Sequence, residues 1–331
     1  MGFLLLQERD LKEILTMDKV IEAVEKGFRE EGNGRSQMPS KSYLYYGRHN
    51  GDLRCMPSYL EESDISAVKV VNVHPENQCK YGLPTVMATV LLVDTHNGML
   101  KSVMGGTWLT AMRTGAASGV ATKYLARKNS SVVGMVGAGV QARTQLMALK
   151  EVLPELERVR VNDLRKDTMN TFAEVMGSIL DLDVIPVESV KDTVRGADVV
   201  VATVPTREPL IRGEWIDDGT HILGIGADAP GKEEFFPDIW SRAKVVVDDW
   251  KQASHSGDIN VAISQGLITR RDIWAELGEI VAGKKEGRTS EEEVTLFDST
   301  GIAVEDAVTA DLAYREAVGR GLGKELDIWI P

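Results

Sequence analysis

A glycine-rich turn follows an apolar run in the middle of the chain. The stretch "SVVGMVGAGVQA", residues 131–142, leads from a strand-like segment into Gly137, Gly139 and Ala142, and a helical pattern follows. In a turn of the form G-x-G-x-x-G/A, the first glycine permits the tight turn and the second lets the backbone approach a pyrophosphate. The third small residue allows helix and strand to pack closely. Because the start of the next helix attracts phosphates, the pattern predicts a dinucleotide site.

An acidic residue after the next strand bears on the choice of nucleotide. Asp163 ends the run "RVRVND", 26 positions after Gly137 (163 − 137), where about 20 is typical. A carboxylate there can bind the ribose diol and repel a 2′-phosphate, which favours NAD. Arg165 and Lys166 follow at once and could receive that phosphate instead, so NADP stays open. The plainer alternative is that Asp163 caps a turn.

Several cations interrupt otherwise apolar segments. Lys69 stands inside "ISAVKVVNV", and Arg113 stands inside the small-residue segment "TAMRTGAASG". Burying an unpaired cation is costly, so such residues usually meet an anion or a water-filled cleft. Strand alternation that turns Lys69 to solvent is the alternative. Arg113 falls where the two expected domains meet, within reach of a carboxylate or phosphate, and Lys41 and Arg54 are two further candidate cations.

A second Gly-rich segment carries an acid. In "GIGADAPGKEEF", Asp228 follows a predicted strand in the later part of the nucleotide-binding region. Ligands of open α/β sheets bind at the carboxyl ends of the strands, which would bring Asp228 near a nicotinamide. A carboxylate there could take a proton from a substrate amine or from water. The alternative is an Asx turn that stabilises the loop.

The elements that position these residues fall into two patterns. Residues 42–104 consist of short β-rich runs separated by Gly, Asn, Pro and Asp, which is typical of a meander. Helical spacing marks 10–31, with a break near residues 16–18, and 107–126. After residue 131, strands and helices alternate, and the Val/Ile-rich runs indicate a parallel sheet covered on both faces.

The last helical segment, "GIAVEDAVTADLAYREAVGRG", could pack back on the first part of the chain. We therefore expect an α/β protein in which a Rossmann dinucleotide-binding domain, residues 116–304, is inserted into a β-rich α+β domain. That second domain, residues 1–115 plus 305–331, would bind the substrate and form the dimer contact.

Composition excludes other classes of protein. A chain of 331 residues suits two domains, and its net charge of −12 argues against binding to nucleic acid or to anionic membranes. No apolar run reaches the roughly 20 residues of a bilayer-spanning helix, and "MGFLLLQERD" does not fit a signal peptide. No metal-ligand spacing or G-x-S-x-G motif occurs. Cys55 and Cys79 fit no disulfide scaffold, so we expect a cytoplasmic protein without a metal site.

Five blocks of the sequence resemble the ornithine cyclodeaminase/mu-crystallin family, and within it the archaeal-type alanine dehydrogenases. In the order of the family, the blocks are "VKVVNVHPEN", "AMRTGAASGVATKYLA", "GAGVQARTQ", "GADAPGKEE" and "FDSTGIAVEDA". Together they cover nearly the full length and are far more specific than a glycine turn alone. The resemblance implies a Rossmann domain inserted into a β-rich domain that forms a homodimer.

The resemblance also implies roles for individual residues. Lys69 would contact the substrate and exchange a proton with it, and Arg113 would lie between the substrate carboxylate and the cofactor. Lys41 would be a further carboxylate ligand, and Asp228 would act as general base. The expected cofactor ligands are Arg113, Thr114, Gly137, Gly139, Val140, Gln141, Asp163, Gly226, Ala227, Lys232 and Ser299.

One departure from the family pattern concerns the substrate. Where cyclodeaminases carry a glutamate that helps to hold the distal amine of ornithine, this chain has Arg54 in "LRCMP". An arginine repels a second ammonium group and can pair with a carboxylate. The leading hypothesis is NAD-dependent oxidative deamination of a small amino acid, most simply L-alanine to pyruvate and ammonia. Alternatives are ornithine cyclodeaminase, a cyclic ketimine (pyrroline-2-carboxylate) reductase, and a non-catalytic nucleotide-binding protein like the crystallin-type relatives.

Overall fold

The computed structural model describes residues 2–327, and the chain divides into two compact units. Unit 1 comprises Met1–Arg113 and Ile302–Pro331, and unit 2 comprises Thr114–Gly301. One boundary falls within helix α4 (Thr107–Leu125), and the other falls just before helix α11 (Ala303–Arg320). Both units combine helices with a large sheet, which confirms the expected α/β class.

The sheet of unit 1 is largely an antiparallel meander in which β4, β5, β6 and β7 pair in succession, as the short β-rich runs predict. Strand β1 joins its edge, parallel to β7 and antiparallel to β16, and the sequence pattern did not indicate it. The strands are β1 (Gly2–Leu6), β2 (Ser36–Gln37), β3 (Ser42–Tyr46), β4 (Gly51–Leu60), β5 (Ile65–Val73), β6 (Val86–Val93), β7 (Leu100–Gly105) and β16 (Lys324–Asp327).

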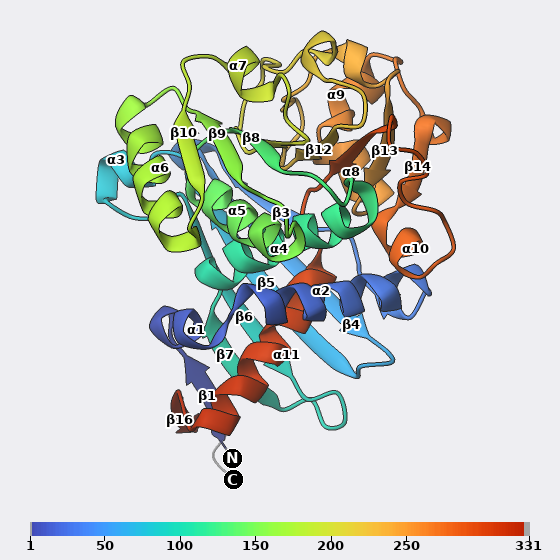
Figure 1. The fold of residues 1–331 in the computed structure, drawn as a ribbon. Helices are drawn as coiled ribbons and strands as arrows, with labels where there is room; N and C mark the ends of the chain where they lie inside the picture. Colours follow the sequence, from blue (N-terminus) through green and yellow to red (C-terminus); the bar gives the residue numbers. More distant parts are fainter. Residues whose placement is uncertain (1, 328–331) are drawn as a thin grey trace. The chain divides into compact units, whose positions relative to one another are not determined.

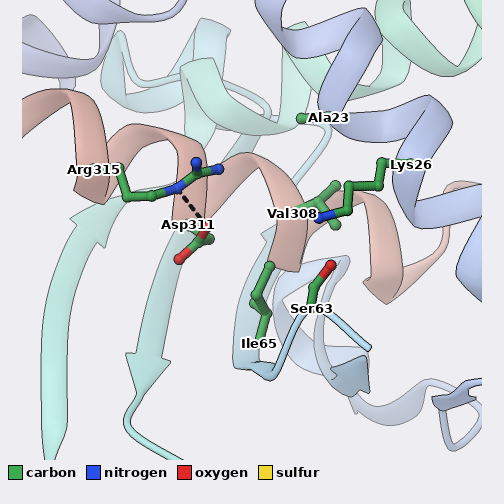
Figure 2. Close-up of a pocket in the computed structure, with 7 residues that line it drawn as sticks. All are labelled: Ala23, Lys26, Ser63, Ile65, Val308, Asp311 and Arg315. Atoms are coloured by element: carbon green, nitrogen blue, oxygen red, sulfur yellow. Dashed lines mark hydrogen bonds and ion pairs between the residues drawn. The ribbon is translucent and has the colours of Figure 1, made fainter. Parts of the chain in front are cut away.

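Helix α11 covers one face of this sheet. It packs against β4, β5 and β6 and lies along α2 (Met17–Gly32) (Figure 1). The helical segment near the N-terminus is broken at residues 15–16, so that α1 (Glu8–Ile14) precedes α2 as a separate helix. A short helix α3 (Asn77–Tyr81) follows β5. A shallow cavity of about 310 Å³ between α2 and α11 has the charged side chains of Lys26, Asp311 and Arg315 around it (Figure 2).

Unit 2 contains a parallel sheet in the order β10-β9-β8-β11-β12-β15-β13-β14. Its first five strands in chain order therefore lie 3-2-1-4-5, and the direction of the strand order reverses between β8 and β11, where ligands of such sheets bind. The strands are β8 (Val132–Val136), β9 (Arg158–Asn162), β10 (Asp183–Pro186), β11 (Val199–Ala202), β12 (His221–Gly224), β13 (Ala243–Val247), β14 (Ile273–Glu276) and β15 (Val294–Asp298). Six of them coincide with runs that the sequence marks as strands; β14 and β15 do not.

The helices of unit 2 follow its strands. The section of α4 within this unit packs tightly on α5, since a Cβ added to Gly115 would lie 2.4 Å from the carbonyl oxygen of Thr144. This close approach explains the small residues of the segment. The helices are α5 (Val140–Val152), α6 (Lys166–Leu180), α7 (Val190–Val194), α8 (Trp250–Ser256), α9 (Ile259–Ser264) and α10 (Leu277–Val281), with α5 and α6 packed together (Figure 1). Among the described residues, no helix combines the length and apolar character needed to cross a bilayer.

Candidate active site

The glycine turn of unit 2 has the geometry that a pyrophosphate requires. Gly137 follows β8 with φ of +101°, in the region that favours glycine, and a Cβ there would lie 2.5 Å from Thr203 Oγ1. Gly139 is the residue before α5, and a Cβ on it would meet no atom within 4 Å. The first glycine is therefore required by the turn, whereas the second leaves room beside the backbone. Val140 and Gln141 begin α5, and Ala142 is fully buried behind them.

Asp163 contacts the glycine turn from the neighbouring strand end. Its Oδ2 accepts a hydrogen bond from the backbone N–H of Ala138 at 2.9 Å, and its Oδ1 accepts one from the N–H of Arg165 at 2.9 Å. The carboxylate therefore caps the turn that follows β9, which is the structural role considered for Asp163 in the sequence analysis. It also holds the glycine turn through the N–H of Ala138. Lys166 pairs with Glu188 at 3.2 Å on the surface.

Two further segments end at the same edge of the sheet as the glycine turn. Gly226 and Ala227 follow β12, with Asp228 on the same loop paired to Lys232. Ser299 follows β15 and donates its N–H to the carbonyl oxygen of Gly224 at 3.0 Å. Because carboxyl ends of parallel strands share one edge, these predicted cofactor residues lie along the edge where such sheets bind nucleotides.

Unit 1 contains a buried cluster of ionised side chains around Lys69. Lys69 lies on the buried face of β5, where it pairs in register with Met56 on β4 and Val90 on β6. Its side chain is 1% exposed, and Nζ donates to Oδ1 of Asp306 at 2.7 Å. The solvent-facing alternative for this lysine is therefore wrong.

Arg113 belongs to the same cluster. Its Nε donates to Asp306 Oδ1 at 2.9 Å, and its Nη1 donates to Glu305 Oε2 at 2.7 Å. Both acids lie in the first turn of α11, where Glu305 also accepts the N–H of Ile302. The sequence analysis did not single out Glu305 or Asp306. The signal that could have identified them is a pair of adjacent acids in an otherwise apolar helix start. A carboxylate at such a buried position needs a cation or a hydrogen-bond donor as its partner.

The environment of Lys69 changes its proton affinity. Burial, and then the charge of Arg113, lower the pKa of Lys69 to about 7, although Asp306 opposes the shift. The charge of Lys41 acts in the same direction as that of Arg113. The second oxygen of Asp306, Oδ2, is buried without a hydrogen-bond partner among the described residues. A lysine with such a pKa can both release and take up a proton near neutral pH.

Arg54 lies on the same face of the sheet as this cluster. It is two residues from Met56, the register partner of Lys69, and alternate residues of a strand share a face. Its Nε and Nη2 donate to the two carboxylate oxygens of Asp52 at 2.9 and 3.1 Å, and its guanidinium lies 5.5 Å from the ring centre of Tyr43. The charge of Arg54 is thus balanced in part by Asp52, a partner that the sequence analysis did not consider.

Other side chains of unit 1 with possible chemistry are His74, Cys55 and Cys79. His74 stacks on Tyr46 and lines a separate open cavity of about 620 Å³. Cys55 and Cys79 are free thiols. Within residues 2–327, no group of His, Cys, Asp and Glu side chains could hold a metal ion. The geometry therefore leaves two candidate parts of a site, the cation cluster of unit 1 and the nucleotide edge of unit 2.

Comparisons with known proteins point to one family. The model of the ornithine cyclodeaminase/mu-crystallin family matches residues 3–321. Alanine dehydrogenase of Archaeoglobus fulgidus is 43% identical over 98% of both chains. A solved archaeal alanine dehydrogenase dimer with bound NAD superposes with a TM-score of 0.94, at 42% identity and covering 99% of this chain and 100% of the other. The Δ(1)-pyrroline-2-carboxylate reductase of Thermococcus litoralis, solved with NADH and L-proline, superposes with a TM-score of 0.95 at 44% identity. The match covers 98% of this chain and 100% of that chain.

Proposed function

Because the chain belongs to the ornithine cyclodeaminase/mu-crystallin family, we propose that it is an NAD-dependent oxidoreductase that converts L-alanine to pyruvate and ammonia. The reaction is L-alanine, water and NAD⁺ giving pyruvate, ammonium, NADH and a proton. The observation that carries the proposal is the buried Lys69–Asp306–Arg113 cluster, with a lysine whose pKa is about 7. A non-catalytic binding protein would not need a titrating lysine in that position.

The nucleotide edge of unit 2 fits NAD. Gly137 satisfies the turn and Gly139 leaves space next to the first turn of α5, whose amides would hold the pyrophosphate. Asp163, at the end of β9, favours a ribose diol over a 2′-phosphate. When bound, NAD accepts a hydride from the α-carbon of the substrate. Gly226, Ala227, Lys232 and Ser299 are the proposed ligands at the ends of β12 and β15.

The cations of unit 1 would hold the substrate carboxylate. Arg113 and Lys41 are the proposed carboxylate ligands, and Arg54 adds positive charge on the same face of the sheet. Holding the carboxylate fixes the orientation of the α-carbon, which raises the rate of hydride loss by lowering its entropic cost. Arg54 also disfavours a second ammonium group, which supports alanine over ornithine.

Two groups can move the protons. Lys69 in its neutral form would take a proton from the substrate ammonium before hydride loss. After hydride loss, water adds to the imine, and either Lys69 or Asp228 would remove the proton of that water. Asp306 holds Lys69 in place and, by its charge, keeps the pKa of Lys69 from falling further.

A second candidate is reduction of a cyclic ketimine, Δ(1)-pyrroline-2-carboxylate to L-proline. It is favoured by the 44% identity and the TM-score of 0.95 to the Thermococcus litoralis reductase. This reaction uses the same carboxylate ligands and a hydride in the opposite direction, but it protonates the ring nitrogen and releases no ammonia. Lys69 would then act as an acid.

One panel of substrates separates these functions. L-Alanine with NAD should give NADH and pyruvate in equal amounts, and NADP should be used less well. Pyrroline-2-carboxylate with NADH giving proline faster than pyruvate and ammonia give alanine would favour the second candidate. Proline and ammonia from ornithine, without accumulation of NADH, would establish a cyclodeaminase. Tight binding of NADH without turnover of any of the three would overturn an enzymatic function.

We also propose that the chain forms a homodimer, since the archaeal alanine dehydrogenase to which it is similar was solved as a dimer. Light scattering coupled to gel filtration should give twice the mass of 36.3 kDa. A monomer at micromolar concentration would contradict this.

A further inference from the structure

Unit 2 contains a pair of buried carboxyl groups that the proposed chemistry does not use. Glu234 and Asp258 are 1% and 0% exposed. Glu234 lies shortly after the loop that carries Asp228, and Asp258 immediately precedes α9. Buried acids are rare unless they are paired with cations or bonded to donors, so their contacts require an explanation.

Glu234 holds the ends of two adjacent strands. Its Oε1 accepts the N–H of Val204 at 2.6 Å, and its Oε2 accepts the N–H of Gly226 at 2.7 Å. Val204 follows β11, and Gly226 follows β12. One carboxyl group therefore fixes two neighbouring strand ends at the edge of the sheet where nucleotides bind.

Glycine makes this approach possible. A Cβ on Gly226 would lie 2.5 Å from Glu234 Oε1, and a Cβ on Gly224 would lie 2.8 Å from Asp258 Oδ2. Any side chain at either position would displace one of the two carboxyl groups. The glycines of "LGIGAD" thus make room for the acid pair as well as for the loop.

Asp258 completes the arrangement only if it carries a proton. Its Oδ1 accepts the N–H of Glu234 at 2.6 Å, while its Oδ2 is buried and accepts no hydrogen bond among the described residues. The carboxyl group of Asp258 is close enough to that of Glu234 for the charge of Glu234 to raise the pKa of Asp258. Both oxygens of Glu234 already accept backbone N–H groups, so Glu234 suits the ionised form. A proton on Asp258 Oδ2 turns a repulsion between two carboxylates into a hydrogen bond.

We propose that Glu234 and Asp258 share one proton and together act as positioning residues, which hold the β11 and β12 ends and the Asp228 loop in the form that binds the nicotinamide nucleotide. The inference rests on the proposed use of this edge for NAD. Loss of the shared proton would place two negative charges side by side, release Gly226 and Val204, and loosen the loop.

The surroundings of the pair favour retention of the proton. Burial raises the pKa of Glu234 to about 7, and burial with the charge of Glu234 raises that of Asp258 well above its ordinary value. The other charged groups acting on the pair are acids as well. Glu233 is one, and Asp298 is another, since it accepts the N–H of Asp258 at 3.0 Å and its own pKa is raised by burial and by Asp258. Asp248 acts on Asp298 in turn.

Two isosteric substitutions should have opposite effects. In Asp258→Asn, Oδ1 can still accept the N–H of Glu234, while the amide NH₂ permanently supplies the donor that the proton supplied. In Glu234→Gln, an NH₂ group replaces one of the two oxygens that accept backbone N–H groups, so one donor faces another. Glu233→Gln makes the same change one residue away and leaves both members of the pair in place. Because Glu233 also raises the pKa of Asp258, this control should keep the decline of NADH affinity with pH but begin it at lower pH.

The measurement is the affinity for NADH as a function of pH, by fluorescence titration in the absence of substrate. The wild type and Glu233→Gln should bind NADH more weakly as pH rises through the titration of the pair. Asp258→Asn should bind as the wild type does at low pH and keep that affinity at high pH. Glu234→Gln should bind about tenfold more weakly at every pH, because a buried donor has lost its acceptor.

Two outcomes would overturn the proposal. One is an Asp258→Asn variant with the same pH dependence as the wild type; the other is a Glu234→Gln variant that binds NADH normally. If Glu234→Gln fails to fold, the Asp258→Asn titration still decides. None of these measurements requires turnover, so a failure of alanine oxidation would count against the proposed substrate and not against this inference.

Discussion

The two units bury charge in opposite ways. In unit 1, the cations Lys69 and Arg113 are matched by the acids Asp306 and Glu305, with ion pairs of 2.7 to 2.9 Å. In unit 2, Glu234, Asp258 and Asp298 lie close to one another and are stabilised by backbone N–H groups rather than by cations.

The difference shows how each region can respond to pH. A cluster of two cations and two acids needs no added proton, and burial, together with the charge of Arg113, lowers the pKa of Lys69 instead. A cluster of buried acids is stable only while it retains protons. Burial raises the pKa values of all three groups, and for Asp258 and Asp298 the neighbouring acids raise them further. The cluster of unit 1 creates a lysine that can exchange protons with a substrate. The cluster of unit 2 holds the strand ends in place only while it keeps a proton.

The largest effect should come from removing the titrating group of unit 1. Lys69→Met should lower kcat/KM for L-alanine by about 10³-fold, which is within the usual contribution of general acid–base catalysis. Lys69→Arg keeps a cation that does not titrate, so it should lose kcat while retaining more of the substrate affinity than Lys69→Met. Steady-state kinetics of both variants, with circular dichroism to verify folding, test this. A Lys69→Met enzyme with more than a tenth of wild-type activity would exclude Lys69 as the proton carrier and leave Asp228.

Breaking the charge balance of unit 1 should be the next largest effect. Asp306→Asn keeps the acceptor oxygen but leaves Lys69 and Arg113 facing Glu305 alone, and loss of one partner from a buried ion pair costs about 3 kcal/mol. Asp306 raises the pKa of Lys69, so its removal should shift the limb of the pH–rate profile that reports Lys69 to lower pH. Urea unfolding and the pH profile of kcat/KM measure the two effects. An unshifted limb would mean that the limb does not report Lys69.

The acids that pair with Lys69 and Arg113 mark the limit of what could be predicted from the sequence. Lys69 stands out because a lysine interrupts an apolar strand, and Arg113 because it interrupts a helix of small residues. Asp306 is 237 residues away from Lys69 and is brought to it only because α11 returns to cover the sheet of unit 1. The return of that helix was expected, but its rotational setting, which decides which acid meets which cation, depends on packing that no local pattern encodes.

The same limit applies to unit 2. The glycine turn and the first strands are predictable from local sequence. The strands show an apolar pattern, and the turn needs a glycine for its backbone conformation. Asp258, in "HSGDIN", belongs to no recognisable pattern. Its position next to Gly224 depends on the hydrogen bonds that the N–H groups of Asp258 and Ile259 donate to Asp298, which ends β15. Strand β15 was missed because "VTLFD" is short and follows a long charged segment.

A smaller loss is expected from weakening the acid cluster of unit 2. Asp298 accepts the N–H groups of Asp258 and Ile259 at 3.0 and 3.1 Å, one on each oxygen. Asp298→Asn replaces one acceptor by a donor, which should lower the free energy of unfolding by about 1–3 kcal/mol. It also removes a negative charge next to Asp258, so the pKa of Asp258 should fall and the decline of NADH affinity should begin at lower pH. Asp311→Asn, at an acid of unit 1 that pairs with Arg315 across one turn of helix, is the control. Equal behaviour of the two variants in urea unfolding and NADH titration would contradict the proposed role of the cluster.

The prediction that compares the units most directly is the pH dependence of stability. Burial raises the pKa of Glu234, which shares its proton with Asp258, from an ordinary value of 4.5 to about 7, so between these values the folded pair holds a proton that the unfolded state has lost. Stability from this group therefore falls as pH rises through that range, by up to about 1.4 kcal/mol for each pH unit. Lys69 has a folded pKa of about 7 against 10.5, so between those values the unfolded state holds the extra proton and stability rises with pH.

Urea unfolding measured in steps from pH 4.5 to 10 should thus give a contribution to the free energy of unfolding that falls with pH below about pH 7 and rises above it. Asp258→Asn should flatten the lower part alone, because Glu234 then keeps a permanent donor and no longer needs a proton. Lys69→Met should flatten the upper part alone, because it removes the lysine whose charged form is disfavoured by burial. If either variant changed the stability equally below and above about pH 7, the two clusters would not titrate independently. The proposed difference between the units would then be wrong.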